Sequence, residues 1–169
     1  MGDLWLIAAA GLVLCFGFVV LFGAPYLPTL TPQVRVALDL LDLKPGQHML
    51  ELGSGDGKVM LAAVERGWRV TGYELNPILV LVSRWRLRQH RDQATVVWGN
   101  FWRHTWTDAD GIFSFNLQRQ MLKLDTKIMK DCPKRPVRLA SFAFTINGRK
   151  PVGQREGVFL YCYNTKNDR

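Results

Sequence analysis

The chain has 169 residues, of which 48% are hydrophobic, and it carries a formal net charge of +8. This length suits one domain with an appendage, and the hydrophobic share excludes an intrinsically disordered protein. The three cysteines and three histidines show no metal-ligand spacing, and an odd number of cysteines argues against a disulfide framework. We therefore expect no metal site.

The first 34 residues carry one charged side chain, Asp3. The run Leu4–Phe22 is uncharged, and its nineteen residues, at about 1.5 Å each, nearly span a hydrocarbon layer of roughly 30 Å. Trp5 and Tyr26 stand where interfacial aromatic residues belong. The run predicts a single-pass transmembrane helix. Because Arg35 is the first positive residue, the positive-inside rule places the remaining chain on the cytoplasmic or mitochondrial matrix side.

Two other interpretations of this run are weaker. A cleaved signal peptide would have a basic segment before a shorter apolar run. A helix buried in the domain would show a polar face, which this run lacks.

Downstream, helical and extended patterns alternate. We expect helices at 33–43, 57–66, 77–90 and 117–130, and strands at 48–52, 69–73, 95–98, 111–115, 137–146 and 157–163. This alternation predicts an α/β fold with a doubly wound, mostly parallel sheet. Only ten residues separate the last two strands, too few for a crossover helix, so we expect an abbreviated or antiparallel carboxyl-terminal end. The predicted division is a membrane anchor at 1–24, a linker with a lead-in helix at 25–46, and a ligand-binding domain at 47–169.

A strand, a glycine turn and a helix follow one another where the sequence reads Glu51-Leu-Gly-Ser-Gly-Asp-Gly57. Glycines let the backbone approach a ligand and leave helix N–H groups free to bind it. A dinucleotide fingerprint would need its third glycine at Lys58, so the spacing disfavours NAD. An acid two residues before the first glycine resembles the first motif of class I S-adenosylmethionine (AdoMet) methyltransferases, where the acid belongs to the amino-acid end of the site. A glycine-rich turn without a ligand is the alternative.

Two later positions also suggest a nucleoside. Glu74 ends the second strand, seventeen residues after Gly57, where a carboxylate accepts ribose hydroxyls in AdoMet and NAD sites alike. Asn100 and Phe101 follow the third strand; in methyltransferases this loop binds adenine through a polar side chain and an apolar cover. The alternatives are a surface acid, a turn residue and a core phenylalanine.

Two further groups leave their role open. Asn116 and Gln118 follow the fourth strand, where they either line the mouth for a target amine or, for Asn116, cap a helix. Four arginines (Arg84, Arg86, Arg88, Arg91) form either a solvated helix face or a face toward anionic lipid or an acidic partner. No nucleic-acid motif accompanies them.

Four segments resemble one family: Glu51–Gly57, Gly72-Tyr-Glu-Leu-Asn-Pro77, Ser83-Arg84 and Asn100-Phe-Trp102. They are similar to membrane-anchored protein-lysine methyltransferases related to the mitochondrial enzymes for the ATP synthase c-subunit and the adenine nucleotide translocase. Residues 24–29 look like the segment that precedes the fold in that family. The family usually has Asp at position 100, in the loop that contacts adenine. It usually has proline at position 118, at the exit of the fourth strand, so the acceptor cannot be carried over from it.

The resemblance implies a Rossmann-like class I methyltransferase with AdoMet as cofactor. The predicted cofactor-binding set is Glu51, Gly53, Ser54, Gly55, Gly57, Glu74, Asn76, Asn100 and Phe101. The expected function is N-methylation of a lysine in a membrane-associated protein, without nucleic acid, and no side chain is assigned as general base. A lipid or small-amphiphile methyltransferase and a non-catalytic nucleoside-binding module remain the alternatives.

Overall fold

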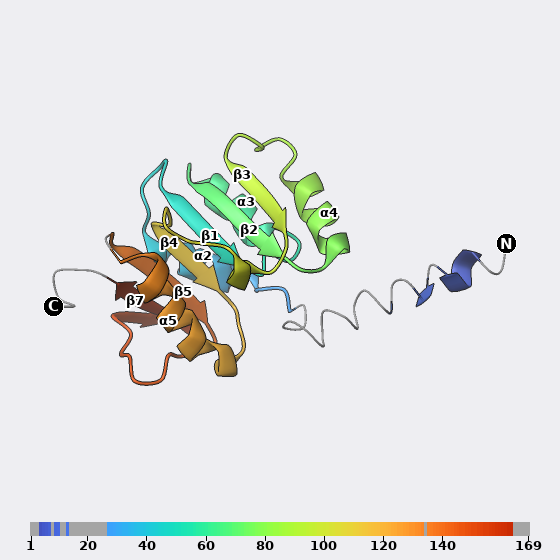
Figure 1. Ribbon diagram of the computed structural model, residues 1–169. Helices are drawn as coiled ribbons and strands as arrows, with labels where there is room; N and C mark the ends of the chain where they lie inside the picture. The colour runs from blue at the N-terminus through green and yellow to red at the C-terminus, as the bar shows by residue number, and fades with distance from the viewer. Residues whose placement is uncertain (1–3, 8, 11–12, 14–26, 134, 164–169) are drawn as a thin grey trace.

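A computed structural model of the protein describes residues 4–7, 9–10, 13, 27–133 and 135–163. Its body is a seven-stranded sheet in the order β3-β2-β1-β4-β5-β7-β6 (Figure 1). The strands are β1 (His48–Leu52), β2 (Arg69–Glu74), β3 (Ala94–Trp98), β4 (Gly111–Ser114), β5 (Val137–Phe142), β6 (Gly153–Arg155) and β7 (Val158–Tyr163). The α-helices are α2 (Thr31–Leu41), α3 (Lys58–Val64), α4 (Pro77–Arg86) and α5 (Met121–Asp131), joined by the 3₁₀ turns η1 (Phe101–Arg103) and η2 (Gln118–Gln120).

The predicted α/β architecture is confirmed. Strands β1 to β5 pair in parallel, and β7 pairs antiparallel to β5. The ten-residue gap that excluded a crossover helix holds β6, which completes an antiparallel hairpin with β7. Three residues, mostly exposed, are too short for a periodic pattern, which is why the sequence did not indicate this strand.

Two apolar layers cover the sheet. On one face, α2, α3 and α4 bury residues against Met49, Val70 and Phe113. On the other, α5 and the segment that follows β3 pack against Leu50, Ile112 and other strand residues. Because β1 is buried at every position, its apolar residues pack into the layers on both faces of the sheet.

The lead-in helix belongs to this folded body. Ala37 and Leu41 of α2 are fully buried, and the helix contacts β5 and β7. The structure starts it at Thr31, two residues before the predicted start, because Pro32 fits the first turn, where no backbone N–H is needed.

Most of the predicted membrane anchor, Leu4–Phe22, lies outside the described residues. Residues 4–7, 9–10 and 13 are helical. Among the residues that the structure describes, no helix is both long enough and apolar enough to cross a membrane.

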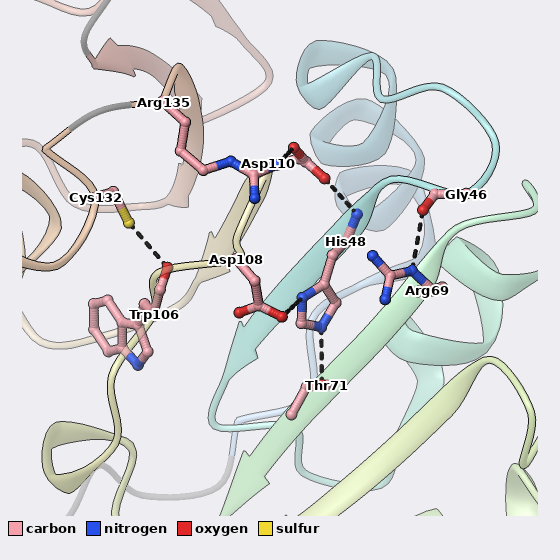
Figure 2. A network of polar contacts seen from close by, with 9 residues as sticks. All are labelled: Gly46, His48, Arg69, Thr71, Trp106, Asp108, Asp110, Cys132 and Arg135. Carbon is pink, nitrogen blue, oxygen red and sulfur yellow. Dashed lines mark hydrogen bonds and ion pairs between the residues drawn. The ribbon is translucent and has the colours of Figure 1, made fainter.

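His48 organises a polar network at the amino end of β1 (Figure 2). The glycine turn follows the other end of this strand. Its backbone N–H donates to Asp110 (2.8 Å), its Nδ1 lies 2.9 Å from Asp108, and its Nε2 lies 2.9 Å from the Thr71 hydroxyl. Arg135 pairs with the same Asp110. These contacts fasten β1 to β2 and to the loop before β4, so His48 has a structural role. Within the described segments, no three His, Cys, Asp or Glu side chains form a group suited to a metal ion.

Candidate cofactor site

A cavity of about 280 Å³ opens at the carboxyl ends of β1, β2 and β4. The strand order reverses between β1 and β4, and such a switch point is where open α/β sheets bind ligands. Seven of the nine predicted site residues line the cavity: Glu51, Gly53, Ser54, Gly55, Glu74, Asn100 and Phe101. Gly57 and Asn76 are not among its lining residues.

The glycine turn is held by β2. The backbone N–H groups of Gly53 and Ser54 both donate to the carbonyl of Tyr73, at 3.0 and 2.8 Å. Gly53 has a φ of +94°, and an added Cβ there would meet no atom within 4 Å. The turn therefore presents a bare backbone to the cavity, as the sequence predicted for a close ligand approach.

Glu74 connects the turn to α4. One carboxylate oxygen accepts from the Gly55 N–H and the other from the Asn76 N–H, both at 2.8 Å. An ionised carboxylate has about four lone-pair positions, so two acceptor positions remain for a ligand. Glu74 thus builds the site as well as lining it, a structural role that the sequence did not indicate.

Gly57 and Asn76 have packing roles. Gly57 is the N-cap of α3, with a φ of +78°, and a Cβ there would lie 2.3 Å from the Ser83 hydroxyl of α4. Asn76 is fully buried, and its side-chain oxygen accepts from the N–H groups of Ile78 and Leu79 at the start of α4. Both residues therefore support the starts of α3 and α4 without lining the cavity themselves.

We expect Asn76→Ala to lower the free energy of unfolding by about 0.5–2 kcal/mol, because the first turn of α4 loses its N-cap. Thermal denaturation should show a Tm lower by roughly 2–4 °C for each kcal/mol. The exposed Asn147→Ala is the matched control; it loses only a long, exposed hydrogen bond from the Gln118 amide (3.4 Å) and should unfold nearly like the wild type. Equal Tm values for the two variants would contradict the capping role.

Asn100 and Phe101 both line the cavity, and each also makes a structural contact. The Asn100 side-chain oxygen accepts from the Trp102 N–H at 3.0 Å and caps η1, while the residue also lines the cavity. Phe101 is buried beside Trp102, with ring centroids 4.7 Å apart, and forms part of the cavity wall.

Three buried polar groups at the cavity lack a hydrogen-bond partner within the described part of the chain. They are a carboxylate oxygen of Glu51, the hydroxyl of Ser54 and the amide nitrogen of Asn116. Burial raises the pKa of Glu51 well above 4.5, and the nearby Asp56 and Glu74 carboxylates raise it further. Buried polar groups are rarely left unsatisfied, so this cluster is suited to a polar ligand.

Other lining residues escaped the sequence analysis. Leu27, Pro28 and Thr29 form a wall that precedes α2, and Phe115, Ala143 and Phe144, which follow β4 and β5, form another. Ala143 has a φ of +68°, which ends β5 four residues before its predicted end. Only the family-like segment 24–29 gave a signal for any of these. Gln118 does not line the cavity; its side chain donates to the Thr145 carbonyl at 2.9 Å.

The fold is that of class I methyltransferases. An RNA methyltransferase from Salinibacter ruber, solved with S-adenosyl-L-homocysteine, superposes with a TM-score of 0.71 at 26% identity, covering 81% of this chain and 92% of that one. Residues 51–153, more than half of the chain, match the ANTKMT methyltransferase domain. The protein therefore belongs to this methyltransferase family.

Curated relatives agree with the family. The human lysine N-methyltransferase of the ATP synthase c-subunit is 32% identical over 63% of this chain and 46% of its own length. The mouse adenine nucleotide translocase lysine N-methyltransferase is 33% identical over 76% of this chain and 56% of its own length. A protein-lysine N-methyltransferase of Saccharolobus islandicus is 26% identical over 75% of this chain and 81% of its own length. The chain thus spans about half the length of the two animal relatives.

Proposed function

We propose that this protein is an AdoMet-dependent N-methyltransferase that acts on a lysine of a membrane-associated protein. The observation that carries the proposal is the cavity at the switch point, where a bare glycine turn and the Glu74 carboxylate meet. The relatives, which are named as protein-lysine methyltransferases, support the choice of acceptor.

In the proposed complex, AdoMet lies across the ends of β1 and β2. Its amino-acid end meets the buried polar groups of Glu51 and Ser54, which lack partners within the described chain. Its ribose hydroxyls donate to the remaining acceptor positions of Glu74. Its adenine lies against Phe101, with Asn100 offering its carbonyl oxygen to the exocyclic amine.

AdoMet supplies an activated methyl group on a sulfonium, so the protein mainly aligns the attacking amine. An acceptor lysine must be neutral to attack. Burial beside a cation lowers the pKa of an amine, so the cavity favours the neutral form. Asn116, buried at the end of β4 with an amide nitrogen that lacks a partner among the described residues, lies on the side where an acceptor would enter. No described side chain is assigned as general base.

AdoMet affinity should rise with pH. Burial raises the pKa of Glu51 in the ligand-free protein, so its carboxyl group stays protonated at pH values above 4.5, its usual pKa. It releases this proton when the cationic ligand binds. Affinity therefore increases up to the raised pKa and then levels off. By the same linkage, the free protein loses stability as pH rises through that pKa. Calorimetry in two buffers of different ionisation enthalpy measures the released proton.

Glu51→Gln is the control for this pH dependence. It cannot ionise, so its AdoMet affinity should be lower and its proton release absent. If the variant and the wild type showed the same proton release, Glu51 would not be the group that meets the ligand.

We further propose that Leu4–Phe22 is a single-pass anchor and that residues 47–169, led by the linker and α2, lie on the cytoplasmic or mitochondrial matrix side. The evidence is the uncharged length of the run and the position of Arg35. Protease protection of a carboxyl-terminal tag in sealed vesicles tests this sidedness. A tag that protease cleaves only from the side opposite the cytoplasm or matrix would overturn the proposed orientation.

The acceptor is tested by incubating the full chain with membranes and AdoMet that carries a labelled methyl group. Label in protein, recovered as methylated lysine after hydrolysis, supports the proposal. Label in extracted lipid would favour a lipid methyltransferase, and label in RNA would favour the activity for which the Salinibacter neighbour is named. AdoMet binding without label in any fraction would favour a non-catalytic module.

A further inference from the structure

The outer face of α4 is both apolar and basic. Leu81, Arg84, Trp85 and Arg88 recur at the spacing of one helix face, with Arg88 just past the helix end. The Leu81 side chain is 65% exposed and Trp85 is 67% exposed. The stretch 77–91 contains no acidic residue but four arginines. Such a face exposes apolar surface, whose hydration is unfavourable, next to positive charge that can bind an anion.

Arg84 fixes the position of this face. Its guanidinium donates twice to the carbonyl of Val96, at 3.3 and 3.0 Å. Val96 belongs to β3, the strand at the edge of the sheet, and α4 lies beside this strand at the periphery of the molecule (Figure 1). The bond covers a carbonyl of an otherwise open edge.

A second tryptophan completes the surface. Trp98 ends β3, is 65% exposed, and donates its indole N–H to the Leu75 carbonyl at 3.1 Å, just before α4 begins. At the other end of α4, Arg88 stacks over Trp85 at 4.5 Å and donates to its carbonyl. Both rings are therefore held in place while they face solvent. We call Leu81, Arg84, Trp85, Arg88 and Trp98 the α4 edge surface.

We propose that the α4 edge surface docks on an anionic lipid bilayer. Tryptophan prefers the interface between headgroups and hydrocarbon, and arginine extends its charge to lipid phosphates while its stem covers apolar surface. A second copy of the chain would bring arginine against arginine. The chain also carries a nineteen-residue uncharged run of bilayer length. This run favours an anionic membrane over other anionic partners. This docking is independent of methyl transfer.

The test uses the full chain in vesicles of phosphatidylcholine, with or without phosphatidylserine, that contain lipids brominated in their tails. Bromine quenches tryptophan emission on contact. We expect stronger quenching in anionic vesicles than in neutral ones. A Trp85→Phe and Trp98→Phe double variant should lose this extra quenching and retain any contribution of Trp5.

Charge is tested with Arg88 of this surface and Arg91, which is also exposed and lies three residues further along the chain. Arg88→Gln with Arg91→Gln should weaken docking roughly fivefold for each arginine. Arg119→Gln with Lys130→Gln removes the same charge from η2 and α5, where both side chains are exposed, and should dock like the wild type. If the chain stays in solution, the same variants are compared by the fraction that floats with anionic vesicles.

Equal quenching in the wild type and the Arg88→Gln, Arg91→Gln variant would overturn the proposal. So would equal losses in the two charge variants, because the effect would then come from net charge alone. Salt-sensitive quenching by single-stranded RNA without any response to vesicles would assign the surface to nucleic acid instead. None of these outcomes depends on whether AdoMet binds.

Discussion

Glu74→Ala should raise the dissociation constant of AdoMet at least about a hundredfold. The substitution removes the carboxylate proposed for the ribose, and hydrogen bonds to a charged group contribute about 1.5–3 kcal/mol each. It also takes away the acceptor of the Gly55 and Asn76 N–H groups, so the glycine turn and α4 lose their link. Isothermal calorimetry with AdoMet and with S-adenosylhomocysteine measures the loss.

Two variants separate binding from folding. Glu65→Gln changes an exposed acid just after α3 and should bind AdoMet like the wild type. Glu74→Gln keeps one carbonyl oxygen for one of the two N–H donors and should unfold at a temperature between those of Glu74→Ala and the wild type. AdoMet affinity in Glu74→Ala equal to that of the wild type would remove Glu74 from the proposed ribose site.

Gly57→Ala should destabilise the fold, whereas Gly53→Ala should mainly impair ligand binding. Both glycines have positive φ, which costs an alanine about 1–2 kcal/mol. At Gly57 the new Cβ would also lie 2.3 Å from the Ser83 hydroxyl and 3.2 Å from its Cα, so the total loss should reach about 2–4 kcal/mol. At Gly53 the Cβ would enter open space in the cavity wall, where it would meet a bound ligand.

Urea denaturation gives the free energy of unfolding of each variant, and calorimetry gives its dissociation constant for AdoMet; together these values test the contrast. Ser83→Ala, introduced with Gly57→Ala, removes the closest clash and should recover part of the stability. Ser83→Ala introduced with Gly53→Ala should not recover stability in the same way. A larger stability loss at Gly53 than at Gly57 would mean that the two glycines have exchanged roles.

The parts of this protein that follow local rules could be predicted from sequence. The central strands and α3 were placed within a few residues, because buried strands and their glycine boundaries leave a clear pattern. The cavity also followed, since parallel strands bring Glu51, Glu74 and Asn100 to one edge of the sheet. Family resemblance then supplied the chemistry that spacing alone left open between AdoMet and another nucleoside.

What could not be predicted depends on contacts between distant residues. The double use of Glu74, as a lining residue and as the link between two N–H groups, appears only when the turn and α4 are placed in space. The same holds for Ser83, whose packing explains Gly57, and for Gln118, which bonds to Thr145 and not to the cavity. The wall at Ala143 and Phe144 required a left-handed residue that is not a glycine, for which no sequence rule exists.

If Leu4–Phe22 is the membrane anchor proposed above, the cavity wall formed by Leu27, Pro28 and Thr29 limits how far the cavity can be from lipid. An anchor that ends at Phe22 leaves five peptide steps before Leu27, and an extended chain covers at most about 3.6 Å in each step. The mouth of the cavity would then be tethered within roughly 18 Å of the bilayer surface. A target amine on a distal domain would be out of range, whereas one on a short loop between membrane spans would be within it.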